Sequence, residues 1–342
     1  MKIGETKLIG ENIAPDNAKN LAIYDGDTKI CTVDISRMRL PENLGAKLYS
    51  FGLLSDIHMT ATTDSYSPNG QKFDTALTFF ETQGCSFVCI SGDLTNYGFW
   101  KDVTIEYTTA QFGEYKNICD AHPNLAVYGC CGNHENYTKP ITENLEDLEA
   151  YMGYGINYTI EQGNDLFIFA GQSTETIPMS RDTYNWLCDI LGANKNKRCF
   201  VFIHPFVDAG DSGNPLGLHH QPIFNNPKVS TFGYDKATFI NLLTNYPNTI
   251  LFHGHSHMDF ENQFVVKNAI YSTALGYKSV HIPATAYTRN VSTGEVVQNA
   301  NGKQGYVCDV YANYIVLKGY DFSLNDFVPI AQYCINTTIK TT

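Results

Sequence analysis

Five short apolar runs in this chain are each followed by a cluster of Asp, Asn or His, and this repeated pattern constrains the fold most. The first run, Tyr49 to Leu54, has the length of a strand buried on both faces and precedes Asp56 and His58. The other clusters are Ser91-Gly92-Asp93, Gly132-Asn133-His134-Glu135, His204-Pro205 and His253-Gly254-His255-Ser256-His257. Chance would not place such residues repeatedly after apolar strands, so the ordered set carries the signal rather than any single triplet.

The segments between these runs alternate strand and helix patterns. The other expected strands of this part are Phe87–Ile90, Leu125–Tyr128, Cys199–Ile203 and Thr249–Phe252, with Tyr158–Ile160 and Leu166–Ala170 as a hairpin. The expected helices are Phe73–Gln83, Thr104–Ala121, Thr142–Met152 and Ser180–Leu191, the last with Ser180 as N-cap. This alternation predicts a largely parallel sheet covered by helices, with ligand chemistry at the carboxyl ends of the strands.

Both ends of the chain have β patterns. Leu21–Tyr24 and Lys29–Asp34 flank an Asp-Gly dipeptide, which predicts a hairpin. The strands expected near the C-terminus are Ala269–Thr273, Val280–Pro283, Gly305–Tyr311, Tyr314–Tyr320 and Phe327–Cys334. We therefore predict an α/β (α+β) fold with a small N-terminal β element in residues 1–45, a catalytic domain in 46–285 and a β-rich C-terminal extension in 286–342 that packs on it.

Composition and charge exclude some functions. The formal net charge of -12 argues against a general binder of nucleic-acid backbones, although bound divalent cations can invert the field at a site. No apolar run approaches the ~18 residues of a membrane span, and residues 1–7 lack the apolar region of a secretory signal. The ten cysteines show no C-x-x-C spacing. We expect reduced thiols in a cytoplasmic protein without a membrane partner.

Asp56 and His58 illustrate the chemistry that the clusters predict. In extended backbone, residues i and i+2 point to the same side, so these two side chains can converge on one ligand. Taken alone, the pair is more often a turn with a satisfied histidine. Oxygen and imidazole donors without thiolate suit Mn²⁺, Fe or Zn²⁺ in an open site rather than a structural zinc site.

The five clusters together resemble the calcineurin-like metallophosphoesterase superfamily, whose motifs D-x-H, G-D, G-N-H-[D/E], H and G-H-x-H occur here in that order. The resemblance covers roughly residues 50–260. It implies two mixed sheets packed face to face with helices outside. It also implies that the metal ligands are Asp56, His58 and His257 for a first ion and Asn133, His204 and His255 for a second, with Asp93 bridging both.

The resemblance also implies a mechanism. Two cations about 4 Å apart clamp a phosphoryl group and lower the pKa of a bridging water, whose hydroxide attacks phosphorus in line. His134, which is not a ligand, donates a proton to the leaving group as general acid. Glu135 either supports that imidazole or is an exposed charge without a role.

Several polar residues near the clusters have two explanations. His204 taken alone fits a strand end satisfied by backbone, and Asn96 either contacts a phosphate or shapes the turn after Asp93. His253 is expected behind the site, because its side chain should alternate away from His255. The remaining histidines to place are His122 and His281, expected to be structural, and His219-His220, in a loop from Asp208 to Pro222 that lies either on the surface or along the substrate cleft.

The sequence departs from the protein Ser/Thr phosphatases after Asp93. Gly92-Asp93 is followed by Leu94-Thr95-Asn96-Tyr97-Gly98 and not by the remainder of a G-D-x-x-D-R-G run, so the Asp-Arg pair with the arginine that binds phosphate is missing. We expect a phosphodiesterase or small-molecule phosphatase with a small phosphorylated substrate. The alternatives are a catalytically retired binding module of a larger, phage-related assembly, with a protein partner on the β extensions, and a nuclease.

Overall fold

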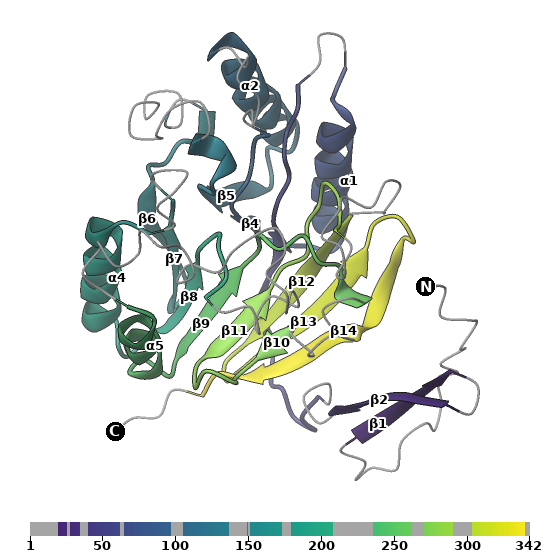
Figure 1. Cartoon of the computed structure of the whole chain (residues 1–342), viewed down its shortest axis with the longest axis vertical. Coiled ribbons are helices and arrows are strands. Elements are labelled where there is room, and N and C mark those ends of the chain that lie inside the picture. The colour runs from purple at the N-terminus through teal and green to yellow at the C-terminus, as the bar shows by residue number, and fades with distance from the viewer. Residues whose placement is uncertain are drawn as a thin grey trace.

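The computed structural model describes residues 20–25, 28–34, 40–61, 65–96, 105–136, 149, 151–172, 179–207, 235–261, 270–289 and 303–338. Within these residues, two six-stranded mixed sheets pack face to face, and two helices cover the outer side of each sheet (Figure 1). The predicted α/β (α+β) class and the two-sheet architecture are confirmed.

The first sheet has the strand order β14-β13-β12-β3-β4-β5. Its strands are β3 (Lys47–Leu54), β4 (Phe87–Ser91), β5 (Ala126–Cys130), β12 (Gln304–Tyr311), β13 (Tyr314–Asp321) and β14 (Asp326–Asn336). β3, β4 and β5 are parallel, whereas β12 pairs antiparallel with β3. The strands β12, β13 and β14 near the C-terminus therefore belong to the same sheet as β3, β4 and β5. The division at residue 285 stays a prediction.

The second sheet has the order β10-β11-β9-β8-β7-β6. Its strands are β6 (Asn157–Gln162), β7 (Asp165–Ala170), β8 (Arg198–Phe202), β9 (Thr249–His253), β10 (Tyr271–Ser272) and β11 (Lys278–His281). β7, β8, β9 and β11 run parallel, and the predicted β6–β7 hairpin is present.

The helices begin at side-chain caps where the sequence offers them. They are α1 (Pro68–Thr82), α2 (Ile105–Ala121), α4 (Arg181–Ala193), α5 (Lys236–Thr244) and the short η2 (His134–Asn136). Ser180 accepts from Thr183 N at 3.1 Å, as its predicted N-cap role requires. Most of the helix predicted over 142–152 lies outside the described residues. Helix α5, capped by Asp235, was not predicted.

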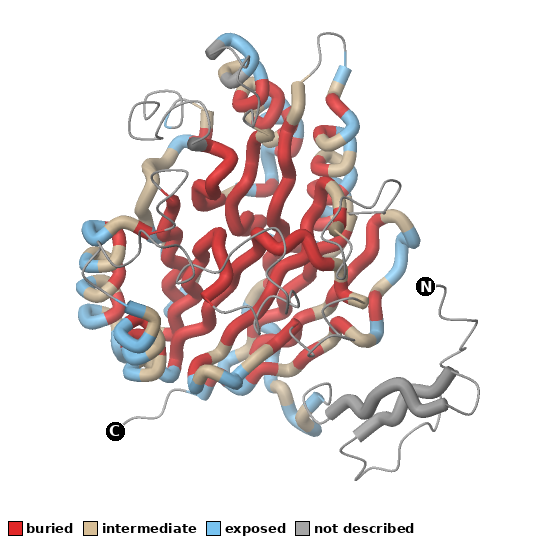
Figure 2. Tube along the Cα trace, viewed as in Figure 1, coloured by how far each residue is buried: buried red, intermediate tan, exposed pale blue. Residues whose placement is uncertain are grey.

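Alternation along the strands divides the core into three layers. Phe51 on β3 meets Phe167 on β7 and Phe200 on β8 between the sheets, with ring centroids 5.2 and 5.6 Å apart. The neighbouring outward residues pack under the helices, as Leu54 does under α1 and α2 and Val201 under α4 and α5. Figure 2 shows the resulting buried centre and the exposed outer faces of the helices. This double-sided burial fixes the strand ends that carry the candidate site.

The N-terminal part contains the predicted hairpin. β1 (Asn20–Asp25) and β2 (Thr28–Asp34) pair antiparallel in a two-stranded sheet of their own. The boundary of a separate element at residue 45 stays a prediction.

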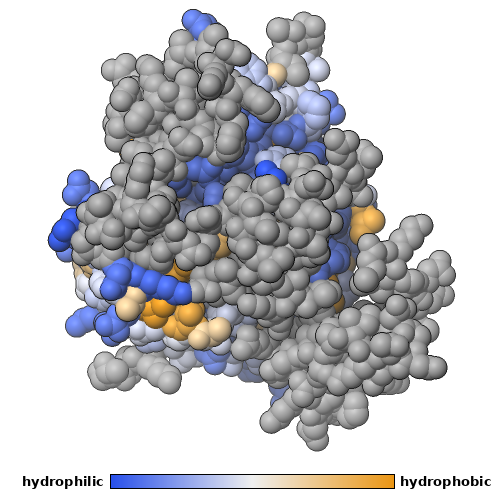
Figure 3. All heavy atoms as spheres, in the orientation of Figure 1, coloured by the Kyte–Doolittle hydropathy of each residue, from blue (hydrophilic) through white to orange (hydrophobic). Residues whose placement is uncertain are grey.

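The described surface is mostly hydrophilic on the face seen in Figure 3, with an apolar area beside α5. No helix among the described residues is long and apolar enough to cross a bilayer. The nine cysteines with described side chains are free thiols and most are buried, in agreement with the prediction of reduced cysteines.

Candidate metal centre

The loops that carry the predicted site residues meet at the carboxyl edge of both sheets. In the first sheet, Asp56 N donates to Gly92 O at 3.1 Å, which joins the loops after β3 and β4. In the second sheet, Gly254 N donates to His204 O at 3.0 Å. His204 Nδ1 lies 2.8 Å from Ser91 O and connects the two sheets. The site therefore lies across both sheets and depends on their packing.

Left-handed backbone, rather than extended backbone, turns the site side chains toward one another. The site residues with positive φ are Asp56 (53°), His58 (49°), Asp93 (52°), His255 (72°) and His257 (55°). The expectation that Asp56 and His58 converge through strand alternation is thus wrong in its geometry, although the two side chains do converge. Such conformations cost about 1–3 kcal/mol each in non-glycine residues and cluster at functional sites.

A first donor group consists of Asp56, His58, Asp93 and His257, one donor atom of each lying within 4.8 Å of all the others. His257 Nε2 lies 3.1 Å from Asp56 Oδ1 and 3.1 Å from His58 Nε2. His58 Nε2 lies 3.6 Å from Asp93 Oδ2. All four residues are buried.

A second donor group consists of Asp93, His204 and His255. His204 Nε2 lies 3.1 Å from Asp93 Oδ2 and 3.0 Å from His255 Nδ1. Asp93 therefore belongs to both groups, as expected for the bridging ligand that the family resemblance implies. Asn133 is buried in the loop after β5 beside Asp93, because the next residue, His134, donates its backbone N–H to Asp93 Oδ1 at 3.0 Å. The ligand role of Asn133 stays a prediction.

The chemistry of these donors fits bound cations. Asp56 Oδ1 and Asp93 Oδ2 are buried, and imidazole nitrogens of His257 and His204 approach them to 3.1 Å each. Imidazole nitrogens of His58 and His257 approach each other to 3.1 Å, a distance at which only one of the two can donate a proton to the other. Carboxylate and imidazole donors held this close suit Mn²⁺, Fe or Zn²⁺.

The charges of the site are strongly interdependent. Burial favours neutral Asp93, but the nearby charges of His204 and His134 outweigh it and hold its pKa well below the ordinary value. Burial opposes protonation of His204, yet Asp93 raises its pKa to about 9. Burial and His204 lower the pKa of His255 to about 3. Without cations, protons on selected imidazoles must balance the carboxylates, and metal binding would release them.

Glycines and short side chains hold the loops against each other. A Cβ at Gly254 would lie 1.8 Å from Ser55 Oγ, and one at Gly132 would lie 2.2 Å from Asp93 Oδ1. Ser55 Oγ in turn donates to Asp56 Oδ2 at 2.6 Å. Asn69 Nδ2 donates to His58 O at 2.7 Å. The carboxylates are thereby fixed before any ligand arrives.

His134 lies beside both donor groups without belonging to either. Its ring meets the His58 ring edge-on with centroids 4.3 Å apart, and its Nε2 is 3.8 Å from Asp93 Oδ2. Burial lowers the pKa of His134 well below its ordinary value, and the Asp93 charge opposes that fall. The proton-transferring role of His134 stays a prediction.

Glu135 is fully buried, which rules out the alternative that it is an exposed charge without a role. Its carboxylate accepts from Gly132 N at 2.6 Å, from Thr95 N at 2.9 Å and from Thr95 Oγ1 at 3.1 Å. Burial and the Asp93 charge raise its pKa to about 7. Glu135 thus ties the loop after β4 to the loop that carries Asn133 and His134.

The other histidines lie where the sequence placed them, as far as the structure describes them. His253 Nε2 lies 2.9 Å from Ser279 Oγ, behind the site, and His281 Nε2 lies 2.7 Å from Ser256 Oγ. His122 Nε2 lies 3.1 Å from Asp74 Oδ1 and its Nδ1 2.9 Å from Glu81 Oε2, both carboxylates of α1. His219-His220 and the loop 208–222 lie outside the described residues. Asn96 N donates to Met59 O at 2.8 Å, and a phosphate contact of its side chain stays a prediction.

The structure adds two residues that the sequence did not indicate, Tyr287 and Arg289. The Tyr287 ring lies 4.4 Å from the His257 ring and 5.2 Å from the His58 ring. Arg289 Cζ lies 5.6 Å from the Tyr287 ring centroid. Burial raises the pKa of Tyr287 to about 12, against the effect of the Arg289 charge. No motif identifies these residues, because their proximity arises from the packing of the segment after β11.

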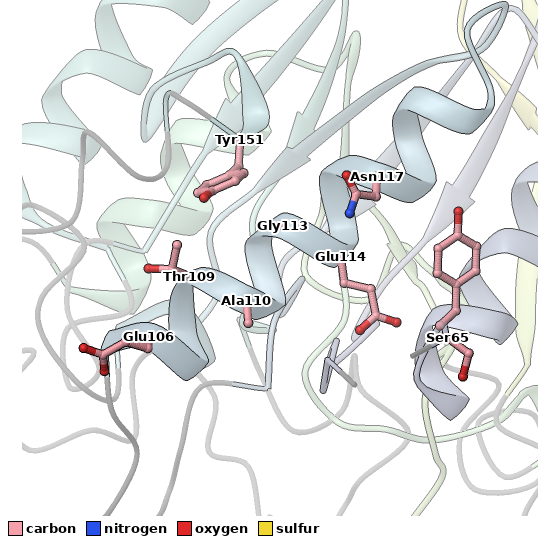
Figure 4. Close-up of a pocket in the computed structure, with 9 residues that line it drawn as sticks. Ser65, Glu106, Thr109, Ala110, Gly113, Glu114, Asn117 and Tyr151 are labelled. Atoms are coloured by element: carbon pink, nitrogen blue, oxygen red, sulfur yellow. The ribbon is translucent and has the colours of Figure 1, made fainter. Parts of the chain in front are cut away.

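A separate cavity of about 690 Å³ lies between α2 and the start of α1 (Figure 4). Glu106 and Glu114 line it, and none of the predicted site residues does. Glu114 Oε1 accepts from Ser67 N at 2.5 Å, so this carboxylate caps α1. The metal-centre chemistry therefore lies elsewhere.

Comparisons with known proteins agree with this geometry. The family model of calcineurin-like phosphoesterases matches residues 49–259, more than half of the chain. A dimetal phosphatase from Danio rerio aligns with 86% of this chain and 100% of its own at 13% identity and a TM-score of 0.56. GAP50, the anchor in the inner membrane complex of Plasmodium, aligns with 86% of this chain and 90% of its own at 11% identity and a TM-score of 0.52. A search of curated protein sequences gave no match. At these identities the structural likeness establishes the fold alone.

Proposed function

Because the chain belongs to the calcineurin-like phosphoesterase family, we propose that it is a metal-dependent phosphoester hydrolase that acts on a phosphodiester or a small phosphorylated metabolite. The observation that carries this proposal is the position of Asp93, whose carboxylate belongs to both buried donor groups. One carboxylate shared by two groups is the arrangement that a two-metal hydrolytic site needs.

The ligand assignment follows the two donor groups. Asp56, His58 and His257 would hold one cation, and His204 and His255 the other, with Asp93 shared. Asn133, which belongs to neither group in the structure, is the further ligand that the family motif assigns to the second cation. Bound there, two cations of Mn, Fe or Zn would polarise phosphoryl oxygens and lower the pKa of a water. The protein contributes fixed donor positions, because hydrogen bonds such as that from Ser55 Oγ to Asp56 Oδ2 orient the carboxylates beforehand.

His134 is the proposed proton donor to the leaving group. It lies against His58 and its backbone N–H is fixed by Asp93 Oδ1. Burial favours its neutral form, and the negative charge of an arriving phosphate would add to that of Asp93 in favouring the protonated form. A general acid placed in this way increases the rate most for poor leaving groups.

The substrate class follows from what the site lacks. The segment after Asp93 has no Asp-Arg pair, so recognition of phosphate as in the protein Ser/Thr phosphatases is not expected. The net charge of -12 disfavours long nucleic acids. A small phosphodiester or phosphorylated metabolite satisfies both conditions.

The proposal is tested with bis(p-nitrophenyl) phosphate after metal removal by a chelator and dialysis. We expect turnover to return on adding Mn²⁺, Fe²⁺ or Zn²⁺ and not on adding Ca²⁺, whose oxygen-rich coordination this histidine set does not suit. Absence of turnover of a phosphoester panel with every metal, together with no bound metal, would contradict the proposal.

A second candidate function, an anchoring or binding module, has one observation in its favour. The Plasmodium neighbour on the same fold is named an anchor. The two donor groups argue against this candidate, since a binding module has no need to keep buried carboxylates and imidazoles together. A stable partner complex from a pull-down, combined with no turnover, would favour it. Incubation with single-stranded DNA separates a nuclease from both.

A further inference from the structure

The segment 285–289 is hydrogen-bonded to the backbone of two members of the first donor group, Asp56 and His257. Ala286 N donates to Asp56 O at 3.0 Å, and Arg289 N donates to His257 O at 3.0 Å. Lys72 Nζ on α1 donates to Ala286 O from the other side. His257 Nδ1 lies 3.2 Å from Tyr287 O. These contacts place the segment at the rim of the site and keep it in register with two of the predicted ligands.

Tyr287 and Arg289 form an aromatic and cationic pair on this segment. Both side chains are half-buried. The Tyr287 ring packs against the His257 and His58 rings, and the guanidinium carbon of Arg289 lies 5.6 Å from the Tyr287 centroid. A guanidinium at this distance from an aromatic face is held by cation–π attraction. The attraction orients the guanidinium before a ligand binds, so less side-chain entropy is lost on binding.

The guanidinium of Arg289 supplies a positive charge for phosphate binding that the segment after Asp93 lacks. The arginine that directly follows the second Asp of a G-D-x-x-D-R-G run is missing after Gly92-Asp93, where Tyr97 occupies its position. Cations bound by Asp56, Asp93 and the histidines would make the site positive, and a positive side chain at its rim adds to the attraction for an anionic substrate. An arginine fork is the side chain best suited to two oxygens of one phosphate.

We propose that Arg289 binds non-bridging oxygens of the substrate phosphate and that Tyr287 holds its guanidinium beside the His257 side of the site. This inference rests on the proposed phosphoesterase function and adds to it a substrate class. Arg289 favours a dianionic terminal phosphate over a singly charged diester, because the dianion offers one more charge to pair with the guanidinium.

The test uses the full chain loaded with Mn²⁺ and the variants Arg289→Gln and Arg289→Lys, with Arg181→Gln on the exposed start of α4 as a matched control. Calorimetry measures the Kd for inorganic phosphate. We expect Arg289→Gln to weaken phosphate binding about tenfold or more at unchanged metal content. Arg289→Lys should recover part of the loss, since it keeps the charge without the fork. Phosphate binding by Arg289→Gln that equals that of Arg181→Gln would overturn the inference.

Kinetics give the substrate preference. Arg289→Gln should raise KM more for p-nitrophenyl phosphate, a dianion, than for bis(p-nitrophenyl) phosphate, a monoanion, with a smaller change in kcat. Equal KM changes for both substrates would overturn the preference for a dianion.

If Arg289→Gln does not fold, chemical modification of the wild-type chain tests the same inference. Phosphate should protect Arg289, and not Arg181, from phenylglyoxal, and equal modification with and without phosphate would overturn the inference. Calorimetry and protection need no turnover. An inactive wild type whose phosphate binding depends on Arg289 would contradict the proposed hydrolase while supporting the anion site. An active wild type whose phosphate binding does not change on replacing Arg289 would support the proposed hydrolase and contradict the anion site.

Discussion

The space between the two sheets buries carboxylates at both of its ends, and the two ends balance that charge differently. At the amino ends of the strands, Asp165 accepts from Arg198 Nε at 2.9 Å and from Arg198 Nη2 and Tyr49 Oη at 2.5 Å each. Arg198 Nη1 also donates to Tyr311 O at 2.7 Å and to Thr337 Oγ1 at 3.0 Å. Tyr49 and Tyr311 belong to the first sheet, and Asp165 and Arg198 to the second, so this network joins the sheets.

At the carboxyl ends, the partners of the carboxylates are imidazoles. Asp56 and Asp93 face His58, His204 and His257, whose charge depends on bound protons. At the amino end, the guanidinium of Arg198 neutralises the carboxylate of Asp165. At the carboxyl end, the carboxylates are neutralised only when protons or cations are bound. A buried charge that its own chain neutralises indicates structure, and one that its own chain leaves to be neutralised indicates a binding site.

Replacing one carboxylate at each end tests whether the two ends differ in function. Asp93→Asn keeps the size of the side chain and removes the charge shared by both donor groups. We expect kcat to fall by more than about 10³-fold, since this change weakens both cation sites. Circular dichroism should show a folded chain. Turnover close to wild type with full metal content would contradict the shared role of Asp93.

Asp165→Asn should have the opposite profile. It leaves Arg198 buried without its charge partner, which costs about 3–5 kcal/mol of unfolding free energy. Urea denaturation measures this loss, with Asp189→Asn on the exposed face of α4 as the control. Turnover and metal content per folded chain should stay at the wild-type level. A stable Asp165→Asn variant that loses metal would remove the distinction between the two ends.

His134→Ala separates proton donation from metal binding at the carboxyl end. Because His134 lies outside both donor groups, its loss should leave metal content unchanged. Turnover of substrates with poor alkoxide leaving groups should fall by about 10²-fold, and that of p-nitrophenyl esters by less. His122→Ala is the control, since His122 pairs with Asp74 and Glu81 away from the site. Equal losses for good and poor leaving groups would argue against proton donation by His134.

The smallest effect is expected for Tyr49→Phe at the amino end. Removing the hydroxyl that donates to Asp165 should cost about 1–2 kcal/mol at neutral pH. Burial and Asp165 raise the pKa of Tyr49 above its ordinary value of 10.0. The unfolded chain therefore loses this proton first, and the stability contributed by Tyr49 is full below about pH 10 and declines as pH rises further.

Urea denaturation between pH 8 and 11 checks this sign. The difference in unfolding free energy between wild type and Tyr49→Phe should shrink above about pH 10. A difference that grows in that range would show that the Tyr49 hydroxyl is not the buried donor.

Much of this organisation was readable in the sequence because burial on both faces leaves a strong local pattern. The apolar runs from Tyr49 and Phe87 onward predicted β3 and β4, and the polar residues after them predicted the site edge. Helix α5 was missed although Phe239, Leu242 and Leu243 have helical spacing and Asp235 is a good cap. Its short length and its position after a Gly/Pro-rich loop obscured that signal.

Other features arise only from tertiary structure. The positive φ of Asp56 and His58 cannot be read from residue type, because neither is glycine. The burial of Glu135 contradicts the usual exposure of glutamate and depends on backbone donors of Gly132 and Thr95. Arg289 belongs to no motif, and it reaches the site because its backbone pairs with His257.

The most direct test of the two-cation account is anomalous diffraction from crystals of the full chain grown with Mn²⁺. We predict two manganese peaks, one among Asp56, His58 and His257 and one among Asn133, His204 and His255, with the Asp93 carboxylate contacting both. A single peak, or peaks that Asp93 does not contact, would contradict the account.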